Sequence, residues 1–74
     1  MGEMRVMSTL GDTKIIWDPK IEDESDAAED QFENLLSKGF KAFKVKKDGK
    51  TGVNVKKFNP DESMYILVPE IKGG

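Results

Sequence analysis

The stretch Met64-Tyr65-Ile66-Leu67-Val68 is the longest apolar run of the chain. It lacks the alternation of apolar and polar residues that is typical of a strand with one solvent-exposed face. Such a run is typical of a strand that is covered on both faces or lies in the centre of a sheet. A turn-forming segment, residues 59–63, precedes it, and Pro69 follows it. We therefore expect a central strand at residues 64–68, and the rest of the chain is interpreted around it.

The amino-terminal part of the chain predicts a hairpin. Residues 4–8 and 14–17 have strand character, and Gly11-Asp12 between them suits a tight turn. If those two residues form the loop, Val6 faces Trp17 across the hairpin. The apolar side chains that then share one side are Val6, Ile15 and Trp17.

A helix is predicted over residues 24–38. The side chains with the three- and four-residue spacing of one buried face are Ala28, Phe32, Leu35 and Leu36. Several acidic residues at the start of this segment complement the positive end of the helix dipole, and Asp23 or Ser25 is the expected cap. Lys38 followed by Gly39 predicts the end of the helix, because glycine readily adopts the left-handed conformation.

A second hairpin is expected from strands at residues 41–47 and 51–58, with lysines on its outer side. The side chains expected to point inward are Phe43, Val45, Val53 and Val55. A loop made of Asp48-Gly49 alone would pair Val45 with Gly52 and separate these side chains. Burial favours the pairs Val45–Val53 and Phe43–Val55, which require an odd loop such as residues 48–50.

Composition limits the kinds of function that the chain can have. Its 74 residues suit one small domain, and it has neither histidine nor cysteine. The usual zinc sites and disulfides are therefore excluded, and neither a cofactor nor a catalytic role is expected. Five consecutive apolar residues cannot span a membrane, so we expect a soluble, cytoplasmic monomer.

Charge is distributed unevenly along the chain. Eight acidic residues lie between Asp18 and Glu33, and eight lysines lie between Lys38 and Lys57. Two interpretations remain open. The two regions form solvated faces that attract each other, or the lysines form a basic face for an acidic partner.

The chain ends in Gly73-Gly74. Two residues without side chains form a narrow segment whose backbone can approach another surface closely. The functional interpretation is a carboxylate, on Gly74, that enters the active site of another enzyme. The alternative is an ordinary frayed end. A precursor that continued past Gly74 would need processing to expose this carboxylate.

The order strand, strand, helix, strand, strand, strand predicts an α+β fold with one helix on one face of a mixed sheet. In this order, and in the tail from Ile66 to Gly74, the chain resembles the ubiquitin-like β-grasp superfamily. It is most similar to the small prokaryotic sulfur carriers and ubiquitin-like modifiers, such as the small subunit of molybdopterin synthase. It differs from the usual sulfur carriers at Glu70, where they have a second proline, and at Lys72, where they have a small residue.

The resemblance implies a single β-grasp domain over residues 1–70 and a flexible tail over residues 71–74. It also implies a separate activating enzyme that uses ATP to adenylate the Gly74 carboxylate, with Gly73 beside it. An acceptor protein or sulfur donor would then receive or supply the transferred group. The residues that would contact such partners are Ile71, Lys72, Lys44, Lys46 and Lys56. Ile66 and Val68 are either core residues or partner contacts.

Two alternatives differ from this carrier interpretation. A non-covalent adaptor of the same fold would bind its partner without using the Gly-Gly tail. Nucleic-acid binding through the lysine-rich hairpin is the weaker alternative, because the chain has a single arginine, Arg5, whereas nucleic-acid-binding domains favour arginine and exposed aromatic residues.

Overall fold

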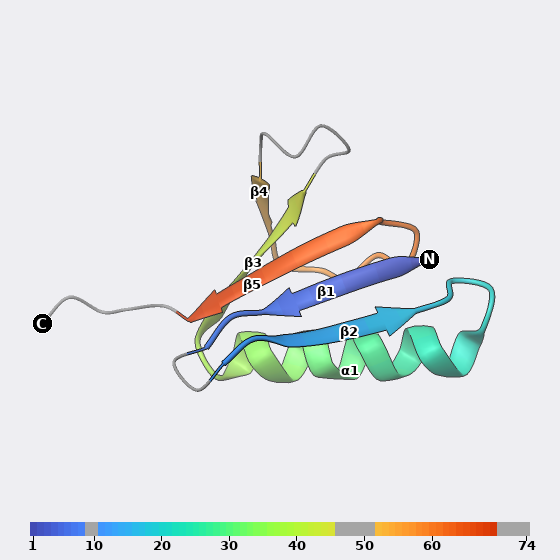
Figure 1. Cartoon of the computed structure of the whole chain (residues 1–74), viewed down its shortest axis with the longest axis horizontal. Helices are drawn as coiled ribbons and strands as arrows, with labels where there is room; N and C mark the ends of the chain where they lie inside the picture. Colours follow the sequence, from blue (N-terminus) through green and yellow to red (C-terminus); the bar gives the residue numbers. More distant parts are fainter. Residues whose placement is uncertain (9–10, 46–51, 70–74) are drawn as a thin grey trace, which may run out of the picture.

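The computed structural model describes residues 1–8, 11–45 and 52–69, which form an α+β fold (Figure 1). The expected order of elements is confirmed in these residues. They comprise β1 (Gly2–Val6), β2 (Thr13–Trp17), α1 (Glu22–Ser37), β3 (Phe40–Val45), β4 (Gly52–Val55) and β5 (Met64–Pro69). No helical segment in these ranges is long and apolar enough to cross a membrane.

The apolar run at the end of the chain forms β5, in the middle of one mixed sheet. The strand order is β2-β1-β5-β3-β4, with β5 parallel to β1 and antiparallel to β3. This confirms the predicted central strand. The strand is not covered equally on its two faces. Tyr65 and Leu67 are buried on the helix side, whereas Met64, Ile66 and Val68 alternate with them and are half-buried.

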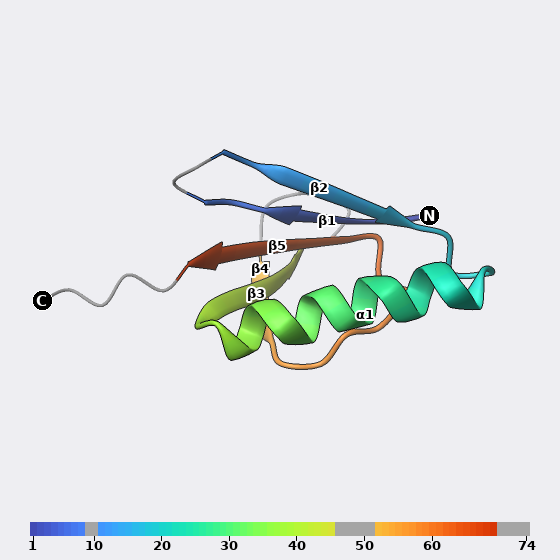
Figure 2. The same ribbon diagram turned by 90° about the horizontal axis from the view of Figure 1, so that it is seen from below.

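Helix α1 crosses one face of the sheet and leaves the other face without a covering element among the described residues (Figure 2). The core lies between the two layers. Its buried apolar residues are Met4, Val6, Trp17, Ala28, Phe32, Ala42, Tyr65 and Leu67. The predicted helix face is confirmed, because Ala28 and Phe32 are buried and Leu35 and Leu36 pack against the core from its margin.

The predicted register of the first hairpin is wrong. Val6 pairs with Thr13, and Trp17 pairs with Gly2, instead of Val6 with Trp17. The turn is not limited to Gly11-Asp12, since the Gly11 N–H donates to the Ser8 carbonyl at 3.2 Å. The shift is four residues, an even number, so Val6, Ile15 and Trp17 still lie on the predicted side of the sheet.

The start of the helix also differs from the prediction. Ile21 is the N-cap, without a side-chain capping bond, and Asp23 and Ser25 lie inside the first turn. Two side chains of this turn instead hold the backbone of Asp18. The Asp18 N–H donates to the Glu24 carboxylate at 3.0 Å, and the Ser25 hydroxyl donates to the Asp18 carbonyl at 3.4 Å. The Asp18-Pro19 bend is thereby fixed to the helix.

The predicted end of the helix is confirmed. Lys38 is the C-cap, and its N–H donates to the carbonyls of Asn34 and Leu35. Gly39 follows with a φ of 98°, in the left-handed region that disfavours residues with a Cβ. This glycine turns the chain directly into β3.

The predicted register of the second hairpin is wrong, and so is the predicted face of β3, whereas Val53 and Val55 of β4 lie on the helix side as predicted. Val45 pairs with Gly52 and Ala42 pairs with Val55, which is the register that the Asp48-Gly49 turn favours. Phe43 and Val45 therefore lie on the face away from the helix and are half-buried. The fully buried position on the helix side is taken by Ala42, the smallest apolar residue of β3. The loop at residues 48–50 lies outside the described residues.

Four aromatic rings of the core, Trp17, Phe32, Phe58 and Tyr65, pack against one another. Trp17 meets Phe58 edge-on at a centroid distance of 4.9 Å, and Phe32 meets Tyr65 in the same way at 5.2 Å. Polar atoms of this cluster hold the turn before β5. The Trp17 indole N–H donates to the Pro60 carbonyl at 3.0 Å, and the Asn59 N–H donates to the Tyr65 hydroxyl at 2.8 Å. Burial raises the pKa of the Tyr65 phenol.

Candidate functional site

The residues predicted to act in partner binding divide into two sets. Lys44 and Lys56 lie within the described part of the chain. The others lie outside it, and these are Lys46, Ile71, Lys72, Gly73 and Gly74. The structure therefore places two of the predicted lysines and the end of β5, which precedes the tail.

The two described lysines do not form the predicted outward face. Lys44 lies on the helix side of β3, half-buried, with its ammonium 3.6 Å from the Glu62 carboxylate. Lys41 lies three residues earlier and so points to the opposite face of the strand. Lys56 is exposed just past the end of β4. This distribution follows from the register, which places Ala42 rather than Phe43 against the helix.

The last described strand, β5, ends at Pro69 in the centre of the sheet. Pro69, the last residue of β5, pairs with Phe40 at the start of β3. On the other side, the Met7 N–H donates to the Leu67 carbonyl at 2.9 Å, just beyond the end of β1. The carboxyl end of β5 is thus bonded to a neighbouring chain segment on each side, and it lies at the same end of the sheet as the last turn of α1 (Figure 1).

The sheet face away from the helix is partly apolar. Ile66 lies in the middle of this face, between Arg5 on one neighbouring strand and Phe43 on the other. The apolar residues of the face are Ile16, Phe43, Val45, Met64, Ile66 and Val68. Ile16 is 51% exposed, and the others are half-buried. Ile66 and Val68, for which a core role and a contact role were both open, lie on this uncovered face.

Charged side chains border the same face on β1 and β2. The Glu3 carboxylate accepts a hydrogen bond from the Arg5 guanidinium at 2.6 Å, and its other oxygen lies 3.2 Å from the Lys14 ammonium. The hydrogen bond from Arg5, with a further contribution from Lys14, lowers the pKa of the Glu3 carboxyl. Glu3 and Arg5 alternate with apolar Met4 and Val6 along β1, and Lys14 lies opposite Arg5 on β2.

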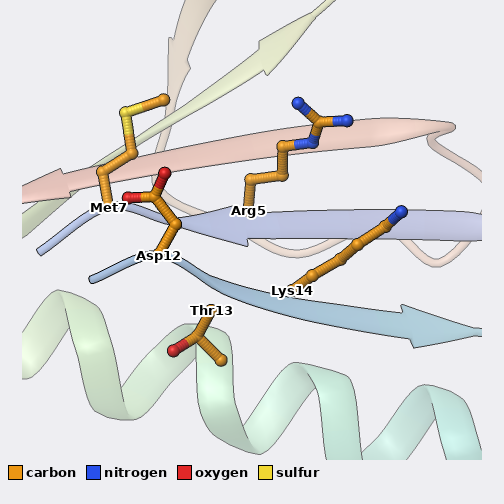
Figure 3. Close-up of a pocket in the computed structure, with 5 residues that line it drawn as sticks. All are labelled: Arg5, Met7, Asp12, Thr13 and Lys14. Atoms are coloured by element: carbon orange, nitrogen blue, oxygen red, sulfur yellow. The ribbon is translucent and has the colours of Figure 1, made fainter.

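A shallow hollow of about 230 Å³ lies beside these charges (Figure 3). It is lined by Arg5, Met7, Asp12, Thr13 and Lys14. Thr13 points toward α1, and the other four side chains extend away from it. Arg5 and Lys14 are already engaged by Glu3, and Asp12 adds a negative charge. The hollow therefore lacks a converging set of groups that would bind an anion.

A larger hollow, of about 300 Å³, lies at the end of α1 between the helix and the β3–β4 pair. Its apolar lining residues are Leu36, Phe40, Ala42 and Val55, and its polar and charged lining residues are Lys41, Asn54 and Lys56. Sequence reasoning missed this site, because Val55 of β4 lies far along the chain from Leu36 and Phe40. Phe40, directly after the helix-ending glycine, was the one local signal.

The described residues contain no group of three or more carboxylates, histidines or cysteines that could hold a metal ion. The features of the described residues that could take part in binding are thus the carboxyl end of β5, the uncovered sheet face and the hollow at the end of α1. Comparison of the chain with protein-family models, curated proteins and solved structures found no match.

Proposed function

We propose that this chain is a β-grasp carrier or modifier of the ubiquitin-like kind, whose Gly74 carboxylate is activated by a separate ATP-using enzyme. One observation carries the proposal. The strand before the tail is the central strand of the sheet, parallel to β1 and antiparallel to β3, so the Gly-Gly tail follows a strand that is paired on both sides. The two glycines at the end of that segment suit a narrow active site.

The proposed chemistry takes place at one carboxylate. A Gly74 oxygen attacks the α-phosphorus of ATP, pyrophosphate leaves, and an acyl-adenylate forms. Hydrosulfide then displaces AMP and leaves a thiocarboxylate, or a lysine amine displaces AMP and forms an isopeptide bond; a proton is lost in each case. The chain is the substrate in both cases. The carboxylate is presented at once, or after cleavage of a longer precursor, and the reaction is assigned to the cytoplasm.

The proposal is tested by producing an amino-terminally tagged chain in its own cells beside a variant that lacks Gly73 and Gly74. Slower-migrating conjugates or a thiocarboxylate should form with the full chain and be absent from the truncated one. Circular dichroism of both chains provides the control, because the two residues follow β5 and their removal should leave the fold intact. Equal products from both chains would contradict the proposal.

A specific observation favours a second candidate, a non-covalent adaptor. The sheet face that carries Ile66 and Phe43 is uncovered in the described residues and is partly apolar, as protein-binding surfaces are. An adaptor would retain its partner after removal of Gly73 and Gly74, whereas a carrier would lose its covalent products. Affinity capture with the two chains used above distinguishes the candidates.

A further inference from the structure

The hollow at the end of α1 has an apolar wall. Leu36 comes from the last turn of the helix, Phe40 from the start of β3 and Val55 from the end of β4. All three are half-buried and pack against the margin of the core. The volume of about 300 Å³ suffices for one large apolar side chain, although it is open on one side.

The hollow lies where the helix gives way to β3. Gly39 turns the chain into β3 directly after α1, and the helix-side face of β4 is only partly covered, with Val55 half-buried there. Figure 1 shows β4 lying away from the helix. Val53, on the same side of β4 as Val55, is 42% exposed.

The outer border of the hollow is a sheet edge. In the described part of the sheet, β4 is the last strand and pairs with β3 alone. An edge strand offers backbone N–H and C=O groups to an extended segment of another protein, and side-chain pockets beside the edge add specificity.

The charge at the edge of the hollow is positive. Lys56 is exposed there and forms no ion pair with a described carboxylate, whereas Lys44 and Lys14 are paired with Glu62 and Glu3. A carboxylate of a partner would gain a favourable interaction at Lys56 without displacing an internal one.

We propose that this groove, lined by Leu36, Phe40 and Val55 and bordered by Lys56, binds an extended acidic segment of a partner protein. A large apolar side chain of the segment fills the hollow, and a flanking carboxylate pairs with Lys56. This site is separate from the tail and from the uncovered sheet face, so it does not depend on activation of Gly74.

The test uses the peptide acetyl-Glu-Asp-Phe-Glu-Asp-amide, titrated into the full chain with backbone isotope labels and followed by NMR. The expected result is a saturable shift of the amides of Leu36, Phe40, Asn54 and Lys56. A peptide with serine in place of phenylalanine should bind at least about tenfold more weakly, since a buried large apolar side chain contributes roughly 1.5–3 kcal/mol.

Two variants with the same change of charge provide the matched comparison. Lys56→Glu should weaken binding about fivefold to tenfold, because an attraction of up to about 1 kcal/mol becomes a repulsion. Lys57→Glu, at an exposed residue that does not line the hollow, should weaken binding less than about twofold.

Three outcomes would overturn the proposal. They are equal weakening by Lys56→Glu and Lys57→Glu, shifts confined to the face that carries Arg5 and Ile66, and the absence of a saturable shift. Each is distinguishable from a failure of the carrier proposal, because none of these measurements uses Gly73 or Gly74.

Discussion

The indole of Trp17 lies directly over Gly2, its partner across the β1–β2 ladder. A Cβ built at Gly2 would collide with the six-membered ring of the indole, and the Trp17 side chain is fully buried. The glycine is therefore required for a close approach. Its place fixes the register of the hairpin, because no other residue of β1 offers the ring this space.

Gly2→Ala should lower the free energy of unfolding by about 1–3 kcal/mol, the usual cost of overpacking a filled core. Urea denaturation measures this cost. The same substitution in a Trp17→Phe background should cost clearly less, because the smaller ring removes the collision. An equal cost in both backgrounds would show that the contact does not explain the glycine.

Glu24→Ala should destabilise the chain by about 1 kcal/mol, because the Asp18 N–H loses its acceptor at the start of the helix. Asp23→Ala is the matched control, since it removes an exposed first-turn acid without a capping bond. Thermal denaturation of the two variants should show the larger loss for Glu24→Ala. A larger loss of stability for Asp23→Ala than for Glu24→Ala would instead support Asp23 as the residue that caps the helix.

The hydrogen bond between Asn59 and the Tyr65 hydroxyl should contribute about 1 kcal/mol, so Tyr65→Phe should lower stability by that amount. The ring stays in place, which limits the change to the hydroxyl. Amide hydrogen exchange at Asn59 should become faster in the variant. Unchanged exchange at Asn59 would mean that the hydroxyl does not hold the turn before β5.

Tyr65 should also make stability sensitive to alkaline pH. Its pKa is raised above the ordinary value of 10.0, chiefly by burial, so the unfolded chain ionises first as pH rises. The contribution is fully present below pH 10.0 and is lost as pH rises toward the folded-state pKa. Denaturation at a series of alkaline pH values should show a steeper loss for the wild-type chain than for Tyr65→Phe. Parallel losses would contradict the burial of the phenol.

The sequence predicts which helix and strands form better than it predicts the register in which the strands pair. The central strand follows from an unbroken apolar run, and the helix follows from apolar spacing that ends at Lys38-Gly39. These signals are local. The order of elements then leaves few ways to cover one sheet with one helix, which is why the central place of β5 was predictable.

The registers were not predictable because the sequence permits more than one. In β3, apolar residues occupy both faces, with Phe40 and Ala42 on one and Phe43 and Val45 on the other. Preference for burying the larger residues selected the wrong face. Ala42 takes the buried position instead, opposite Leu67 of β5, and this choice depends on the pairing of the strands rather than on β3 alone.

The candidate sites also differ in how far the sequence predicts them. Gly73-Gly74 can be recognised in the sequence because the two residues are adjacent. The groove at the end of α1 cannot, because Leu36, Phe40 and Val55 come together only when β4 pairs with β3. The gathering of lysines on one hairpin face, predicted from their number, fails because Lys44 lies on the helix side beside Glu62.

In the proposed function, the carboxylate of Gly74 is the reactive group of this protein. The most direct test is the intact mass of the protein recovered from its own cells, with sequencing of its carboxyl-terminal peptide. The carrier proposal predicts a fraction of chains with sulfur in place of a terminal oxygen, or with Gly74 joined to a lysine of another protein. A free and unmodified Gly74 carboxylate in every growth condition, with no conjugates, would contradict it.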